Sequence, residues 1–524
     1  MSELPLMLKR ALHAFVAFCF GQGIATLGYL LLVPLYLHVW SASLYGEWLT
    51  LGSVVAYFSC LHLGVQTWAV NRLTQAHALG DMEEYRRVRD TAFGFYFCLA
   101  LVGSTALGIF AWWAPVGSWF HLSATSRYGI FVVLLLLGGQ FLWTMPASLL
   151  WWVYGTTGDL ARTQWVMNVS KVLTLAVTGG ALLLWPRLVV VAAAQAAGFL
   201  GIVGLVWWDV HRRFPELAPG FRQAKGSLLR PILSESIFFA VINWAVALTL
   251  HGANLVVAGM LGTAALALFV TTRTLANSVR QLVGLVVHSS STNLTRLEAL
   301  EDKRRLRLAF RLVLFVTVSG CVAVSASLWF EGASVFTFWT RGRLAADIWL
   351  LRLFLLWLVL QSPWMAASAI PVYTNKHKGL AMSYLVSSIG GLLLGALLVP
   401  RLGLKALPIA FIVAEALACY HFVVRNACRI IGEPYLPFAA KLWSGTIGVG
   451  ACAFATTWAI HAAPNLGTFP RWICSGAASL AAVAVSGWAF WLRGEERGFI
   501  RRSAGFGVKL VARALPLPLR STNT

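Results

Sequence analysis

The chain has 524 residues, of which 59% are hydrophobic and only 11% are charged, and its mean hydropathy is +0.74. Soluble domains carry about 25% charged residues, so this composition excludes a water-soluble enzyme. The net charge of +22 would suit nucleic acid only if the basic residues formed a patch on a folded soluble face. They lie between apolar segments instead, so we expect no nucleic-acid partner.

The apolar residues form continuous runs of about twenty, the length that an α-helix needs to cross a hydrocarbon core of about 30 Å. A membrane β-barrel would show alternating runs of about ten residues. We therefore predict an all-α polytopic membrane protein with fourteen transmembrane helices. In chain order they cover residues 11–37, 45–68, 91–113, 128–152, 163–184, 187–208, 234–258, 264–289, 310–330, 346–371, 380–400, 404–424, 440–461 and 471–492.

The distribution of Lys and Arg predicts the orientation of these helices. With the spans placed as above, most of the 41 basic residues fall in segments on one face. Cytoplasmic loops carry an excess of Lys and Arg, so this face is expected to be cytoplasmic. Because the number of spans is even, both termini are expected on the same side.

The longest internal loop, at 209–233, is basic and divides the helices into six and eight. A short echo supports the division, since Leu73, Thr74, Ala78, Leu79 and Asp81 recur as Leu294, Thr295, Ala299, Leu300 and Asp302. Both copies follow an even-numbered helix, which indicates a parallel repeat about an axis along the membrane normal. We predict an N-lobe at 1–208, an inter-lobe loop at 209–233, a C-lobe at 234–424, two further helices at 425–492 and a basic cytoplasmic tail at 493–524.

Cations inside the predicted spans are the main functional signal, because a charge at the bilayer centre costs at least about 2.5–3.5 kcal/mol. Arg273, Asn277 and Arg280 are spaced i, i+4 and i+7, so they share one helical face. Lys171 lies near mid-depth of another span, one turn after Asn168. One interpretation is a hydrated cationic cavity that binds an anionic group such as phosphate. The alternative is snorkelling or ion pairing within the bundle, which suits Arg280 better than Arg273.

Glu415 is an acid near the centre of the span 404–424. It is a candidate for ion coupling by loading and releasing a proton, and the alternative is a neutral acid hydrogen-bonded to a neighbouring helix. Most amides in the spans, including Asn254, are interpreted as interhelical contacts, while His251 fits either role. We find no nucleotide-binding loop, hydrolase motif or metal-ligand spacing, so no cofactor, metal or catalytic residue is expected.

The segment from Tyr45 to Asp81 resembles the bacterial oligosaccharide flippases of the MATE-like MOP superfamily. Those proteins often show a YGxW opening to the second helix, an aspartate-leucine-glycine group, an Asn and a short cytoplasmic loop that contains GD. The matching residues are Tyr45, Gly46, Trp48, Leu63, Gly64, Asn71, Gly80 and Asp81. His62 replaces the aspartate, so a role of that acid does not carry over. Arg273, followed by Leu275, is similar to the arginine often seen in the eighth helix of related lipid-carrier flippases.

The resemblance implies a MATE-like fold with two six-helix lobes around a central cavity, in the bacterial inner membrane. The implied function is movement of an undecaprenyl-pyrophosphate-linked oligosaccharide from the inner to the outer leaflet, driven by ion antiport or by the substrate gradient. The expected partners are this lipid-linked substrate, membrane lipids and polysaccharide polymerase machinery, with the chain itself a monomer. Two alternatives stay open: a membrane-embedded O-antigen polymerase or ligase, and a MATE-type exporter of small molecules.

Overall fold

The computed structural model describes residues 3–62, 65–157, 159–278, 280, 294, 302–373, 376–463 and 466–501. Within these ranges the regular secondary structure is entirely helical, and eleven helices are long and apolar enough to cross a membrane. One of the eleven, Lys378–Ile431, covers two of the predicted spans. The predicted all-α polytopic membrane fold is therefore confirmed.

The helices fall into an earlier and a later group. The earlier group consists of α1 (Glu3–Val39), α2 (Ala42–Ala56), η1 (Tyr57–His62), α3 (Val65–Leu79), α4 (Met82–Trp113), α5 (Val116–Trp119), α6 (Arg127–Thr156), α7 (Leu160–Leu184) and α8 (Leu188–Arg213). The later group begins after η2 (Gly226–Leu228) with α9 (Leu229–Ala247), the π-helical turn η3 (Leu248–Gly252), α10 (Ala253–Leu261) and a helix at 263–278.

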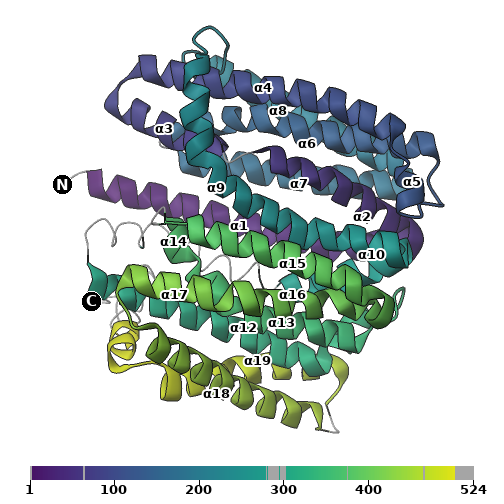
Figure 1. Cartoon of the computed structure of the whole chain (residues 1–524), viewed down its shortest axis with the longest axis vertical. Coiled ribbons are helices and arrows are strands. Elements are labelled where there is room, and N and C mark those ends of the chain that lie inside the picture. The colour runs from purple at the N-terminus through teal and green to yellow at the C-terminus, as the bar shows by residue number, and fades with distance from the viewer. Residues whose placement is uncertain are drawn as a thin grey trace, which may run out of the picture.

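The later group continues with α12 (Lys303–Trp339), α13 (Ile348–Ala367), α14 (Ala369–Tyr373), α15 (Lys378–Leu402), η4 (Gly403–Lys405), α16 (Ala406–Ala418), α17 (Tyr420–Ile431), α18 (Tyr435–His461), α19 (Thr468–Ser486) and η5 (Gly487–Trp491). In Figure 1 the helices α3, α4, α6, α7 and α8 lie in the upper half and α12 to α19 in the lower half, with α1 between them. The pair α18 and α19 packs on α12 at the bottom of this view.

Several helices begin before their apolar run because a polar side chain caps them. Asp81 accepts a hydrogen bond of 2.9 Å from the backbone N–H of Glu84, and Asp302 accepts one of 3.0 Å from that of Arg305. Capping satisfies an N–H group that a helix start leaves without a partner. As a result α4 and α12 begin at Met82 and Lys303, earlier than the apolar spans predicted at 91 and 310. The two caps are also the two aspartates of the sequence echo, so both copies start a long helix in the same way.

The second predicted span, 45–68, is not one continuous helix. It consists of α2, the 3₁₀ turn η1 and the beginning of α3. Hydropathy measures the length of an apolar run but does not distinguish a 3₁₀ turn from an α-helical one, because both bury similar side chains. Residues 63 and 64 of the flippase-like segment lie outside the described residues, as do Thr295, Ala299 and Leu300 of the echo.

The two groups share one apolar cluster at the end of the bundle where α1 passes into α2. This shared cluster contains, among others, Tyr36, Leu51, Ile130 and Val191 from the earlier group and Val257, Phe269, Phe354 and Phe411 from the later group. Away from this end, the earlier group has a cluster around Tyr85 and Val153 and the later group one around Phe310 and Val423, while a further cluster of the earlier group, which includes Val65 and Phe93, packs against Leu233 of α9. The groups are therefore joined most tightly at the end that the charge distribution predicts to be periplasmic.

Backbone contact between α2 and the helix at 263–278 closes this end. Gly46 lies so near Thr263 that a Cβ at position 46 would overlap the Thr263 carbonyl oxygen. The side-chain oxygens of Ser43 and Thr263 are 3.1 Å apart. On α12, Trp339 donates a hydrogen bond of 2.9 Å from Nε1 to the carbonyl oxygen of Leu30 in α1. We call the contact of Ser43 and Gly46 with Thr263 the end contact.

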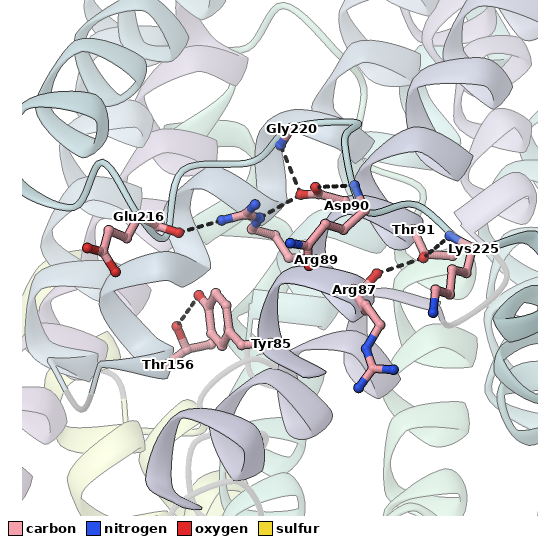
Figure 2. Close-up of polar contacts among 10 residues, drawn as sticks. Tyr85, Arg87, Arg89, Asp90, Thr91, Thr156, Glu216, Gly220 and Lys225 are labelled. Carbon is pink, nitrogen blue, oxygen red and sulfur yellow. Dashed lines mark hydrogen bonds and ion pairs between the residues drawn. The ribbon is translucent and has the colours of Figure 1, made fainter. Parts of the chain in front are cut away.

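The inter-lobe loop is held against the start of α4 by a buried aspartate (Figure 2). Asp90, only 1% exposed, accepts backbone hydrogen bonds of 3.2 Å from Gly220 and 3.0 Å from Gln223. Arg89 bonds to the Asp90 carboxylate at 2.7 Å and to the backbone carbonyl of Glu216 at 2.7 Å. This part of the loop therefore packs on the earlier group of helices. The residues that follow it in the chain connect it to the later group.

Replacing Asp90 with alanine should free this loop. Removing one partner of a buried ion pair costs about 3–5 kcal/mol, and cleavage of a local segment follows how often it opens. We expect trypsin to cut after Arg222 or Lys225 at least tenfold faster in Asp90→Ala, measured by mass spectrometry of timed digests. Glu216→Ala is the control, since it removes only an exposed ion pair with Arg86 at 3.4 Å and leaves the backbone carbonyl that Arg89 contacts. Equal cleavage rates in both variants would show that Asp90 does not hold the loop.

Candidate functional site between the two helix groups

Arg273 is buried in the helix at 263–278, at 8% exposure. Its guanidinium donates hydrogen bonds of 3.1 Å to the carbonyl oxygen of Leu250 and 2.9 Å to Oδ1 of Asn254, and it lies 5.3 Å from the ring centre of Phe269. All three partners are neutral, and no carboxylate pairs with Arg273 among the described residues. A guanidinium has five N–H donors, so a cation with unused donors lies deep in the bundle.

The π-helical turn η3 supplies the first of these partners. A π turn shifts the backbone hydrogen bonds by one residue and often occurs at functional sites. Here the carbonyl of Leu250, inside η3, accepts from Arg273. His251 lies in the same turn, and its buried Nδ1 has no hydrogen-bond partner within the described part of the chain. Hydropathy gives no signal for such a turn, so the sequence did not predict it.

Asn254 connects Arg273 to the opposite group of helices. Its Oδ1 accepts from Arg273, and its Nδ2 donates a hydrogen bond of 2.8 Å to Oγ of Ser53 in α2. Asn254 is 5% exposed and Ser53 is 2% exposed, so this bridge is shielded from water. The interpretation of Asn254 as an interhelical contact is confirmed. Ser53 was not predicted, because a serine in an apolar helix carries no signal of its own.

Arg280 and Asn277 continue along the same helix as Arg273. Arg280 is half-buried, and its charge is close enough to interact with those of Arg273 and Glu415. Neither Arg280 nor Asn277 makes a hydrogen bond to another described residue. The helix therefore places two cations within electrostatic range of each other, with one acid nearby.

Lys171 lies in the other group and does not join this set among the described contacts. Its Nζ donates a hydrogen bond of 3.3 Å to the carbonyl oxygen of Gly21 in α1. One turn earlier, Asn168 donates a 2.7 Å bond to the carbonyl oxygen of Ala17. Both side chains thus bind the backbone of α1, which packs on α7 and runs between the groups in Figure 1.

Glu415 bridges α16 and α13 and is 1% exposed. Its two carboxylate oxygens accept hydrogen bonds of 2.7 Å from Gln361 and 2.9 Å from Trp364. The arrangement agrees with an acid hydrogen-bonded to a neighbouring helix, and ion coupling through it stays a prediction.

A chain of side-chain contacts leads from the Glu415 region toward η3. Trp364 packs on Tyr384, with 5.2 Å between ring centres. Ser388, one turn after Tyr384, lies 2.9 Å from the hydroxyl of Thr249 in η3. The residues between Glu415 and the Arg273 partners are therefore in contact through α15.

Within the described ranges, no group of three or more His, Cys, Asp or Glu side chains could hold a metal ion. The arrangement around Arg273 offers hydrogen-bond donors and positive charge, which suit an anionic group, and a bridge between two helix groups, which suits a change in their relative position.

Comparisons with known proteins place the fold. No family model matches the chain, and no curated protein matches it. Among solved structures it is similar to a multidrug resistance MATE family transporter of the MOP superfamily in its inward-facing conformation, at TM-score 0.58 and 14% identity over 80% of this chain and 95% of that one. The outward-facing conformation matches equally, at TM-score 0.58 and 13% identity over 80% and 96%.

A MOP superfamily transporter from Pyrococcus furiosus, described as having a binding pocket of reverse polarity that suggests a different function, is similar at TM-score 0.56. The identity is 14% over 81% of this chain and 97% of that one. These likenesses show that the chain has the MATE-like fold that the resemblance in its sequence implied. They cover nearly the whole length of each compared structure.

Proposed function

We propose that this protein is a flippase that moves an undecaprenyl-pyrophosphate-linked oligosaccharide from the inner to the outer leaflet of a bacterial inner membrane. The observation that carries the proposal is Arg273, a buried cation between two helix groups with no carboxylate partner among the described residues. A pyrophosphate offers the planar, paired acceptors that a guanidinium binds best.

The other predicted site residues extend this role. Arg280 and Asn277 follow Arg273 on one helix and would bind the second phosphate and the first sugar. Lys171, whose Nζ donates a hydrogen bond to the neutral carbonyl of Gly21, would supply positive charge from the facing group. Glu415, within electrostatic range of Arg280, is the candidate for ion coupling.

The Asn254 bridge suggests how binding and movement are linked. Asn254 holds Arg273 with one atom and Ser53 of the opposite group with another. A phosphate that draws Arg273 away from Asn254 would leave the bridge with one bond instead of two. The end contact could then separate, and the groups would rearrange by alternating access, as in rocking transporters. With the predicted orientation, the shared cluster closes the periplasmic end, so this structure corresponds to an inward-facing state.

Two alternatives give different results in the same assay. A MATE-type exporter of small molecules is favoured by the likeness to a multidrug resistance MATE family transporter, but an exporter of cations should prefer acids where this chain has Arg273 and Arg280. A polymerase or ligase would make a covalent product, and the transporter fold favours transport over that chemistry.

The test uses purified protein in vesicles that contain a lipid-linked oligosaccharide with a fluorescent sugar. We expect the protein to expose sugars of the opposite leaflet to an added quencher, with no change in the chemical identity of the lipid. Protein-free vesicles give the background rate. A rate equal to that background with a range of glycans, or export of organic cations by the same vesicles, would contradict the flippase proposal.

A further inference from the structure

We propose that the surface formed by α17 and the start of α18 is a binding site for the phosphate of an anionic glycerophospholipid. The site is a pocket of about 510 Å³ lined by Phe422, Arg425, Asn426, Arg429, Glu433 and Tyr435. We call it the α17 pocket. It is separate from the Arg273 region, so the inference does not depend on the proposed transport function.

The charge in this pocket is positive. Arg425 and Arg429 are exposed and make no ion pair with another described residue. Glu433 is the one acid in the lining, and its carboxylate already pairs with Arg311 of α12. Two guanidinium groups therefore remain for a ligand, and residues four apart on a helix lie on the same face. Such groups bind phosphate oxygens through charge-assisted hydrogen bonds.

The order of residues along α17 matches the order of groups in a phospholipid. Phe422 is 59% exposed and lies on the apolar side of Arg425, three residues before it. Arg429 follows one turn later, and the helix ends at Ile431. An acyl chain would thus contact Phe422 while its phosphate meets Arg425 and Arg429 near the helix end.

Hydrogen bonds hold Tyr435 and the end of α17, which frame the pocket. The hydroxyl of Tyr435 lies 2.7 Å from Nδ1 of His421, one turn before Arg425 on α17. On the other side, Arg307 donates a 3.1 Å hydrogen bond to the carbonyl oxygen of Ile431 and thereby holds the end of α17. A pocket with fixed walls loses less conformational entropy when it binds a ligand. Basic pockets of this kind between membrane helices bind anionic lipid head groups.

The experiment measures lipid binding to the full-length protein. Purified protein in a neutral detergent is titrated with phosphatidylglycerol or with phosphatidylcholine, and bound lipid is counted by native mass spectrometry. We expect phosphatidylglycerol to bind at least tenfold more tightly than phosphatidylcholine. Arg425→Gln/Arg429→Gln should lose this preference, whereas Arg212→Gln/Arg222→Gln removes the same charge from exposed positions elsewhere and should keep it.

Further arms separate a lipid site from a free phosphate site and from misfolding. Inorganic phosphate and glycerol phosphate at millimolar concentration should not displace phosphatidylglycerol. If inorganic phosphate by itself displaced the bound lipid, the assignment of this pocket to a lipid would be wrong. Arg425→Lys/Arg429→Lys retains the charge and should retain most of the preference, which reports on a folded pocket. Equal losses in the two glutamine variants would mean that only net charge matters, and the proposal would be wrong.

Discussion

Replacing Arg273 with alanine should stop the export of surface polysaccharide and cause the lipid-linked precursor to accumulate on the cytoplasmic side. Truncating a buried, hydrogen-bonded charge that binds a charged ligand costs about 2–5 kcal/mol. At about 1.4 kcal/mol for each tenfold change, flipping should slow by roughly 30-fold or more. The measurement is the flipping rate in vesicles, together with extraction of the precursor from cells that carry the variant as their only copy.

Two further variants identify the cause of that loss. Arg273→Lys keeps the charge but not the planar pair of donors, so we expect an intermediate rate. Arg212→Ala, at an exposed position of α8, should flip at the parent rate. Size-exclusion profiles show which variants fold. If folded Arg273→Ala flipped lipid at the parent rate, the cationic site would have no role in transport.

Adding a single methyl group at Gly46 should prevent closure of the predicted periplasmic end. The Cβ would meet the backbone carbonyl of Thr263, and no side-chain rotation can relieve a contact with backbone. Overpacking of this kind costs about 1–3 kcal/mol, which shifts an equilibrium between two states by roughly 5- to 150-fold. Gly46→Ala should therefore favour the state in which the end contact is separated.

Disulfide formation measures this shift. Ser43 and Thr263 have side-chain oxygens 3.1 Å apart, so Ser43→Cys/Thr263→Cys should cross-link rapidly in a chain whose native cysteines are replaced by serine. Adding Gly46→Ala should slow cross-linking at least fivefold. Gly52→Ala is the matched control, because it lies in the same helix and a Cβ there meets no atom within 4 Å. Unchanged cross-linking in Gly46→Ala would show that the two backbones are not in close contact.

The two sets of variants also test the Asn254 bridge. If binding at Arg273 weakens the link to Ser53, substrate should slow the Ser43→Cys/Thr263→Cys cross-link in the parent chain. In Asn254→Ala the bridge is absent from the start, so the same addition of substrate should have little further effect. Non-additive changes are expected for residues that share a hydrogen bond.

Sequence by itself determined the class and the helical plan of this protein. Continuous apolar runs define membrane helices because each helix must satisfy its own backbone hydrogen bonds in lipid. The cost of a charge in lipid also singled out Arg273 and Glu415 as residues that need an explanation. Each of these signals is local, because it lies within one continuous segment of the chain.

Tertiary structure alone decided what those residues contact. Arg273 and Arg280 share a helix face by spacing, but Lys171 binds the backbone of α1, and spacing carries no information about which helices meet. The Asn254–Ser53 bridge and the contact of Gly46 with Thr263 join segments about 200 residues apart, and the π turn η3 brings the carbonyl of Leu250 to Arg273. Helices in lipid associate through close packing and hydrogen bonds, and small or polar residues make such contacts without any pattern in the sequence. The partner of each side chain therefore depends on how the two groups of helices pack.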